Sequence, residues 1–262
     1  METKYNCSPL CNSSDKIIFN NKFEELEFCK NCSLLKKKKL INQKNRVNQL
    51  EKFNKDVSHV TQSEYFKVQI IENKSIIRKI LSITKKKPNK ILDYGCGYGV
   101  FMFASKELEF EVSGYDINPN FTKNLNEKFE TFKSEHELLN KENLKKFDLI
   151  FCRKVLQLSE NLYDDFNNFN SLLSQNGHLV IMDQVKNNSK YKSIISDNSL
   201  SSHSHLLTIQ TLEFYANAFK LNTKYLKNDF GDLIIIFERK NKKYTNRRIS
   251  IKTLQIFEKL SF

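Results

Sequence analysis

The sequence lacks tryptophan and is poor in proline and glycine. Its 262 residues include no Trp, three Pro and six Gly, whereas lysine, asparagine, isoleucine and phenylalanine are abundant. This mixture is typical of a chain encoded by an AT-rich genome, in which lysine is enriched generally. The formal net charge of +13 therefore favours a solvated, lysine-rich surface. A phosphate-binding patch is the alternative for the basic clusters at residues 36–39, 85–87 and 239–252.

Long hydrophobic runs are also missing. The longest purely apolar stretches, residues 100–104 and 233–237, are far shorter than the roughly 20 residues that a membrane-spanning helix needs. The beginning of the chain has no uninterrupted apolar stretch of the kind found in export signals. We therefore expect a cytoplasmic protein without a membrane partner. Its length allows one substantial core and a small appendage.

Four of the six cysteines lie in two close pairs near the start of the chain, at Cys7, Cys11, Cys29 and Cys32. Thiolates on two tight turns complete a tetrahedron around Zn²⁺, as in zinc knuckles and ribbons. A reducing cytosol disfavours disulfides, and the segment has few large apolar residues with which to fold unaided. We predict a closed, structural zinc site with these four cysteines as ligands. Four unliganded thiols are the alternative.

Strand-like and helix-like patterns alternate after the helix break at Pro88. We expect strands at residues 90–94, 111–115, 131–133, 147–152 and 178–182, helices at residues 99–108, 118–128, 162–173 and 211–219, and a turn at 175–177. The alternation predicts an α/β fold, with a parallel sheet covered by helices on both faces. Two further strands, residues 223–227 and 233–237, are joined by five residues, which permits only an antiparallel hairpin.

Three of the six glycines lie in the loop after the first of these strands, at Gly95, Gly97 and Gly99. Glycine removes the Cβ atoms that would collide with a ligand close to the backbone. At the end of the next strand stands Asp116, an acceptor suited to the vicinal hydroxyls of a ribose. Loop and acid together predict a cofactor that contains a nucleoside. Dinucleotide sites usually read Gly-x-Gly-x-x-Gly, whereas the last gap here is one residue.

Residues 91–99, with Asp93 two positions before the first glycine, resemble the first motif of class I S-adenosylmethionine (SAM)-dependent methyltransferases. Residues 114–116 resemble the acid of their second strand, residues 147–152 their fourth strand, and the hairpin their reversed last strand. The resemblance covers about residues 76–240. It implies a Rossmann-like, seven-stranded, mostly parallel sheet with an antiparallel terminal hairpin, preceded by a small zinc-ribbon-like module. A nicotinamide enzyme is the alternative.

The resemblance also implies the residues that bind SAM. The backbone at Gly95 and Gly97 would face the methionine portion, and Asp116 would hold the ribose. The implied cofactor-binding set is Asp93, Gly95, Gly97, Gly99, Asp116 and Glu135. Glu135, after the weak third strand, is expected near the adenine, with a solvated charge at a helix start as the alternative.

Methyl transfer is an in-line displacement that mainly demands positioning, and an oxygen or nitrogen acceptor adds the need for a base. Two catalytic candidates are Asp183, after the fifth strand, and His205. Residues 205–210 resemble the His-Leu-x-x-Phe-Thr segment of sugar-modifying methyltransferases but depart from it at the Phe-Thr position. A histidine at the surface, or one that tethers a loop, is the alternative for His205. The sequence at 155–158 lacks the Glu-His pair that relatives often carry there.

We divide the chain into a zinc-binding cysteine module (1–40), a helical linker or lid (41–87), a SAM-binding methyltransferase domain (88–240) and a basic, helical tail (241–262). Because zinc-binding cysteine pairs precede SAM domains in families that modify sugars, we expect O-methylation of a sugar, nucleotide sugar or related small polar metabolite. The alternatives are a zinc-containing RNA methyltransferase and a non-catalytic scaffold. The acceptor partner is thus a small molecule or glycan before a nucleic acid, and the oligomeric state is left open.

Overall fold

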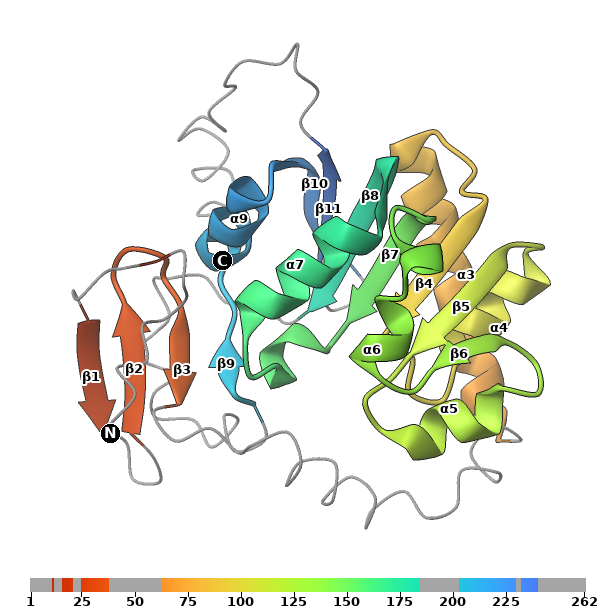
Figure 1. Cartoon of the computed structure of the whole chain (residues 1–262), viewed down its shortest axis with the longest axis horizontal. Helices are drawn as coiled ribbons and strands as arrows, with labels where there is room; N and C mark the ends of the chain where they lie inside the picture. The colour runs from red at the N-terminus through yellow and green to blue at the C-terminus, as the bar shows by residue number, and fades with distance from the viewer. Residues whose placement is uncertain are drawn as a thin grey trace.

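Two β-sheets organise the protein (Figure 1). The computed structural model describes residues 11, 16–20, 25–37, 63–183, 203–229 and 232–239. The larger sheet has seven strands in the order β10-β11-β8-β7-β4-β5-β6, and the smaller one has four. The predicted α/β fold with a seven-stranded central sheet is confirmed.

The large sheet is parallel except for one strand. Its members are β4 (Lys90–Tyr94), β5 (Glu111–Tyr115), β6 (Glu130–Phe132), β7 (Phe147–Arg153), β8 (Leu173–Asp183), β10 (Leu221–Asp229) and β11 (Asp232–Arg239). The pairs β4–β5, β4–β7, β5–β6 and β7–β8 are parallel. Only β11 runs against its neighbours, because it pairs antiparallel with both β8 and β10. The predicted terminal hairpin is therefore confirmed.

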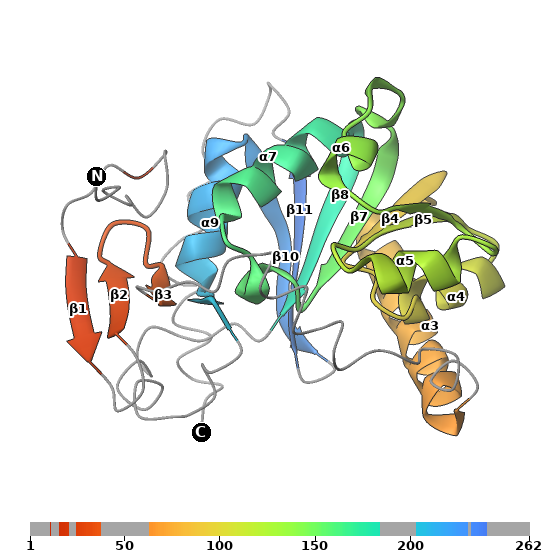
Figure 2. The same cartoon turned by 60° about the horizontal axis from the view of Figure 1, so that its bottom comes forward.

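Helices cover both faces of this sheet. They are α3 (Glu64–Thr84), α4 (Val100–Glu107), α5 (Pro119–Leu125), α6 (Glu135–Leu138), α7 (Leu162–Leu172) and α9 (Ile209–Ala218), with the short 3₁₀ turns η1 (Lys141–Asn143) and η2 (Leu156–Leu158). Figure 2 shows α7 and α9 on one side of the sheet and α3 and α4 on the other. Local signals set the helix starts: the Ser63 side chain accepts the Phe66 N–H at the start of α3, and Pro119 opens α5.

The strands contribute to a separate hydrophobic layer on each face. Along β7, Ile150 belongs to the layer that contains Phe166 of α7, and Phe151 belongs to the layer that contains Ile77 of α3. All four side chains are at most 1% exposed. This alternation follows from the two-residue period of a strand, and burial of both faces explains why the central strands read as continuous apolar runs.

Helix α3, within the predicted helical linker, buries only some of its apolar side chains. Ile76, Ile77 and Ile80 are buried against the sheet, but Val68 and Ile71 are 60% and 64% exposed. The helix extends beyond the sheet at its amino-terminal end, where it has no strand to cover (Figure 2). In the described ranges, no helix is both long enough and apolar enough to cross a membrane.

The predicted turn at residues 175–177 is wrong, because these residues belong to β8. The register between β7 and β8 moves from Phe147 opposite Leu173 to Leu149 opposite His178, so the extra residues of β8 are taken up in an irregularity. A Cβ atom on Gly177 would lie 3.0 Å from the carbonyl oxygen of Phe147. The glycine therefore permits close strand contact there rather than a chain reversal.

The small sheet joins the first described strands to the segment before α9. It consists of β1 (Lys16–Asn20), β2 (Glu25–Cys29), β3 (Leu35–Lys37) and β9 (His205–Leu206), all paired antiparallel. Strand β9 comes from the segment before α9, where the sequence had predicted no strand. Figure 1 shows β9 beside β3, on the side of the small sheet that faces α7. The cysteine-containing segment is thus attached to the rest of the protein by backbone pairing.

The contrast along α3 gives a matched test of the core. We expect Ile77→Ala to lower the free energy of unfolding by about 2–5 kcal/mol, since it empties a buried site, whereas Ile71→Ala changes it by less than about 0.5 kcal/mol. Both substitutions carry the same helix-propensity change, which therefore cancels in the comparison. Urea unfolding followed by circular dichroism measures the difference, and equal effects would contradict the packing of α3 described above.

Candidate active site

The candidate site lies at the edge of the large sheet where the parallel strands end. The loop 95–99 follows β4, Asp116 follows β5, and Asp183 is the last residue of β8. Strand β4 lies between β5 and β7. Strands β5 and β6 are added on one side of β4, and the later strands from β7 onward are added on its other side. Ligands of open α/β sheets bind at such a point, beyond the carboxyl ends of the strands.

The three positions in the loop need glycine for different physical reasons. All have positive φ, +83° at Gly95, +50° at Gly97 and +78° at Gly99. A Cβ atom would meet the Val155 side chain at 2.1 Å on Gly95 and that of Leu125 at 2.7 Å on Gly99. On Gly97 it would meet nothing within 4 Å. Two glycines therefore serve packing, and the third borders an open space that suits a ligand.

Asp116 is held in a fixed orientation by backbone donors. Its Oδ2 accepts the N–H of Gly97 at 2.9 Å, and its Oδ1 accepts the N–H of Asn118 at 2.8 Å. Burial raises the pKa of this carboxyl, and the two N–H bonds oppose that rise. Each carboxylate oxygen has a second lone pair, and Asp116 keeps 9% of its surface exposed, so a ribose hydroxyl fits as a further donor.

Asp93 is a buried acid with a strongly perturbed pKa. It is 4% exposed, and burial raises its pKa to about 8, with the charge of Asp116 acting in the same direction and that of Arg153 opposing it. The Arg153 guanidinium is shared, because its Nη2 also lies 3.2 Å from Glu72 Oε1 and 3.4 Å from Asp232 Oδ2. A cationic ligand beside Asp93 would therefore favour its ionised form.

A buried network that the sequence analysis missed joins β4 to α7. The Tyr94 hydroxyl donates to Asp165 Oδ1 at 2.9 Å, and the Ser159 hydroxyl donates to Asp165 Oδ2. Burial raises the pKa of Asp165 to about 6 against the effect of these two bonds. The network fixes the loop after β7 relative to the residue that precedes Gly95. The sequence contained one signal for this network, because Asp165 is an acid on the apolar side of the helix predicted at residues 162–173.

Glu135 lies at the start of α6, directly after β6 and next to the N-cap residue Ser134. It is exposed. Partial burial raises the pKa of its carboxyl, the nearby charge of Asp164 acts in the same direction, and a hydrogen bond with Asn168 opposes the rise. Its place at the carboxyl edge agrees with the expected position, and its role toward an adenine stays a prediction.

The two catalytic candidates lie on different sheets. Asp183 is 1% exposed and stands opposite Leu233 of β11, at the edge that also carries Asp116. His205 is 3% exposed and stands opposite Lys36 in the β3–β9 pair. The structure thus places Asp183 at the expected edge and His205 within the small sheet, and their roles in catalysis stay predictions.

Three of the four predicted zinc ligands lie together. The Sγ atoms of Cys11, Cys29 and Cys32 are within 4.8 Å of one another, and all three residues are at most 1% exposed. Cys7 lies outside the described residues. The 3.6 Å between the Sγ atoms of Cys11 and Cys29 is too long for a disulfide. It is close to the separation of about 3.8 Å between two ligands of a tetrahedral zinc site.

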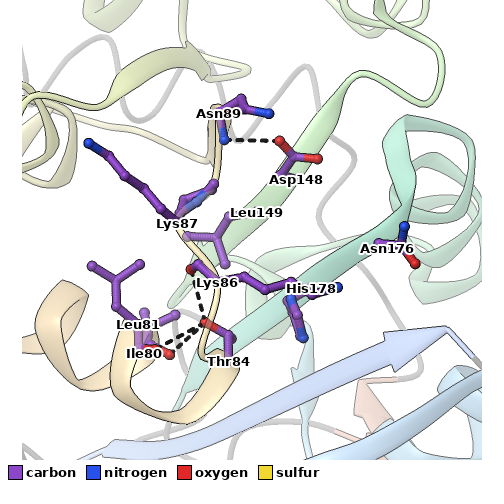
Figure 3. A pocket seen from close by; sticks show the side chains of 11 residues that line it. Ile80, Leu81, Thr84, Lys86, Lys87, Asn89, Asp148, Leu149, Asn176 and His178 are labelled. Carbon is purple, nitrogen blue, oxygen red and sulfur yellow. Dashed lines mark hydrogen bonds between the residues drawn. The ribbon is translucent and has the colours of Figure 1, made fainter.

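One cavity among the described residues lies away from this edge. It has a volume of about 270 Å³ and lies near the amino ends of β4 and β7 (Figure 3). Lys86, Lys87, Asp148 and His178 line it, and the N–H of Asn89 bonds to Asp148 Oδ2 there at 2.9 Å. None of the predicted cofactor-binding residues contributes to this cavity.

Comparisons with known proteins agree with this geometry. The model of a family described as a methyltransferase domain matches residues 69–223, more than half of the 262 residues. A sequence search of curated proteins found no match.

Solved structures share the fold at low identity. A Pyrococcus horikoshii protein has a TM-score of 0.51 at 15% identity, over 68% of this chain and 93% of its own. A Burkholderia thailandensis 1,6-didemethyltoxoflavin-N1-methyltransferase with bound 1,6-didemethyltoxoflavin and S-adenosylhomocysteine has a TM-score of 0.54 at 11% identity, over 85% and 98% of the two chains. An O-methyltransferase family protein of the same organism has a TM-score of 0.54 at 15% identity, over 77% and 64%.

The different surroundings of two glycines predict different effects of one substitution. Gly97→Ala places a methyl group in the open space, so we expect SAM affinity to fall by about tenfold or more while stability falls by about 1 kcal/mol from the positive φ. Gly95→Ala forces a collision with Val155, and we expect a stability loss of at least about 2 kcal/mol. Calorimetric titration and thermal unfolding measure both; a Gly97→Ala chain that binds SAM normally would refute the assignment of this space.

The raised pKa of Asp93 predicts a pH-dependent affinity. Below pH 8 the free carboxyl is mainly protonated, and a cationic donor favours its ionised form, so binding must expel a proton. SAM affinity should therefore rise with pH, by at most about tenfold per unit, and level off above about pH 8. The amino group of SAM also titrates near pH 8, so the measured quantity is the difference from Asp93→Asn. Parallel profiles for the two chains would exclude this role for Asp93.

Proposed function

The chain belongs to the family of methyltransferase domains and is an SAM-dependent methyltransferase, and we propose that its acceptor is a sugar, nucleotide sugar or related small polar metabolite, methylated on oxygen. The observation that carries the proposal is the position of His205. This residue opens the segment that resembles sugar-modifying methyltransferases, and it lies in a strand pair with the cysteine module, the other feature that favours those families. The 1,6-didemethyltoxoflavin-N1-methyltransferase compared above has a small molecule bound in the same fold, which supports a small-molecule acceptor here.

The residues at the carboxyl edge fit the cofactor. Bound SAM supplies an electrophilic methyl group on a sulfonium. The bare backbone at Gly97 lets the cofactor approach the loop, and Asp116 accepts hydrogen bonds from the ribose hydroxyls. Asp93, ionised when a cation is near, contributes a favourable charge on the methionine side. Glu135 extends the site toward the adenine.

On the acceptor side the chain must orient a hydroxyl and remove its proton. We assign this work to Asp183 and His205, because an aspartate and a histidine are the groups whose proton affinities suit a hydroxyl acceptor near neutral pH. Asp183 is almost fully buried at the end of β8, where a carboxylate is a strong acceptor for an alcohol proton. His205 follows the segment 184–202, which lies outside the described residues.

Two cations of the basic clusters give no support to an RNA acceptor, whereas residues 85–87 are exposed. Lys36 is 9% exposed, and its Nζ lies 3.5 Å from Glu27 Oε2. Arg239 donates to the carbonyl oxygens of Asn170 and Leu173, at 2.6 and 2.9 Å. These two cations are therefore used inside the protein and do not form a surface that tracks phosphates.

We also propose that the cysteine cluster holds a structural Zn²⁺. Three buried thiols converge, and the amide of Asn31 donates to Cys11 Sγ at 3.2 Å, as expected beside a thiolate. The fourth ligand in this proposal is Cys7. A site filled by four cysteines leaves no open coordination position. The metal therefore stabilises the fold and does not bind the reacting groups of the methyl transfer.

The acceptor is identified by methyl transfer from labelled SAM to separate pools of nucleotide sugars, glycans and total RNA. We expect incorporation in the sugar pools, and transfer to RNA alone would overturn the proposal. Once an acceptor is known, Asp183→Asn and His205→Asn should lower kcat by about 10²–10⁴-fold with SAM affinity unchanged, if each moves the proton. The control is Asp148→Asn, which changes an aspartate at the opposite edge of the sheet.

Metal analysis tests the zinc proposal directly. We expect about one Zn²⁺ per purified chain and its loss in Cys29→Ser, because a tetrahedral thiolate site tolerates no missing ligand. Cys152→Ser replaces a cysteine that is equally buried, in β7, and should retain the metal. A wild-type chain free of zinc, or equal metal content in the two variants, would show that the thiols are not ligands.

A further inference from the structure

The cysteine cluster is connected to the acceptor side of the site by a short series of hydrogen bonds. On one side, β3 follows directly after the turn that carries Cys32. Strand β3 pairs with β9, with Leu35 opposite Leu206, and the N–H of Lys37 donates to the carbonyl oxygen of Ser204 at 3.0 Å. The segment that holds the predicted base is therefore the fourth strand of the cysteine sheet.

On its other side the same segment is bonded to the loop after β7. The N–H of Ser204 donates to the carbonyl oxygen of Gln157 at 2.8 Å, and the Ser204 hydroxyl donates to the carbonyl oxygen of Leu158 at 3.5 Å. Gln157 and Leu158 belong to η2, and Val155, the residue directly before η2, packs against Gly95 of the cofactor loop. Ser204 thus lies between the cysteine sheet and the loop that borders the cofactor.

A second connection runs through the cysteine turn itself. The N–H of Cys29 bonds to the carbonyl oxygen of Leu34 at 2.9 Å and closes the turn, in which Ser33 has a φ of +57°. The carbonyl oxygen of Ser33 accepts the hydroxyl of Thr208 at 3.4 Å. Thr208 is fully buried and is the N-cap of α9. One end of the segment 204–208 is therefore fixed to β3, and the other end to the turn that carries Cys29 and Cys32.

Strands β2 and β3 need support to present this edge. The small sheet has short strands, and Ile17 and Ile18 of β1 are 37% and 57% exposed. Leu26 and Leu35 are buried on the inner strands, and cysteines ligated to a metal would fix the turn that joins these short strands. From these contacts we propose that Zn²⁺ at the cysteine cluster positions Ser204 and His205, so that metal occupancy governs methyl transfer to the acceptor but not the binding of SAM.

This inference rests on the proposed zinc site, and hydrogen exchange separates the two. Zinc is removed from the full-length chain with a chelator, and amide exchange is compared with that of the zinc-loaded chain. We expect the Ser204 amide, whose bond is to η2, to exchange about tenfold faster or more, whereas the Ile150 amide in the central sheet is unchanged. SAM affinity should stay within about twofold, acceptor turnover should fall by about tenfold or more, and added Zn²⁺ should restore it.

The possible outcomes distinguish a failure of the inference from a failure of the zinc site. If zinc is bound and its removal leaves Ser204 protected, or turnover unchanged, the inference is wrong while the zinc site stands. If SAM affinity falls together with turnover, the metal acts on the whole domain and the inference is again wrong. If the purified chain holds no zinc, both fail.

Two variants give the same test without a chelator. Cys29→Ser should reproduce the metal-free exchange at Ser204, with Cys152→Ser as the matched control. Should Cys29→Ser not fold, Asn31→Ala retains every cysteine, removes the donor to Cys11 Sγ from an exposed position, and should weaken zinc binding. In Asn31→Ala the Ser204 amide should then exchange faster as less zinc is bound. An exchange rate that does not change with zinc content overturns the proposal.

Discussion

The hydrogen bond from the Gly97 N–H to the Asp116 carboxylate, 2.9 Å long, is the interaction on which the site depends. It joins the loop after β4 to the end of β5, where the N–H groups of Gly95 and Cys96 also bond to the carbonyl oxygen of Tyr115, at 2.7 and 2.9 Å. Three bonds thus fix a backbone that has no regular structure of its own. Gly95 is packed against Val155, so of these two glycines Gly97 is the one with free space where a Cβ atom would lie. This space is beside the acid that would hold a ribose.

The features that the sequence predicted correctly are those with a local physical cause. Strand β5 has the predicted bounds, 111–115, because the helix before it and Asp116 after it leave room for only a short strand. The hairpin at the end of the domain follows from a link too short for any parallel crossover. The glycines at positive φ and the position of Asp116 after the next strand also follow from local sequence, and their role toward the cofactor stays a prediction.

The features that the sequence missed depend on partners far along the chain. Strand β9 has two residues, and its partner β3 lies about 170 positions earlier, so no periodic pattern marks it. Residues 175–177 resemble a turn locally, but pairing with β7 makes them part of a strand. Lys36 reads as a solvated charge in a lysine run, yet its place in the sheet buries it beside Glu27. The proposed acceptor side includes one such contact, the β3–β9 pair, and a pairing this distant leaves no local pattern from which to predict it.

The most direct measurement is a calorimetric titration of the purified chain with SAM and, separately, with a nicotinamide dinucleotide, followed by the same titrations of Asp116→Asn. The account predicts saturable binding of SAM, no binding of the dinucleotide, and weaker SAM binding by about tenfold or more in the variant, which lacks the charge that orients Gly97 and accepts the ribose hydroxyls. A chain that binds the dinucleotide in preference to SAM, or that binds SAM equally well without the Asp116 carboxylate, would contradict it.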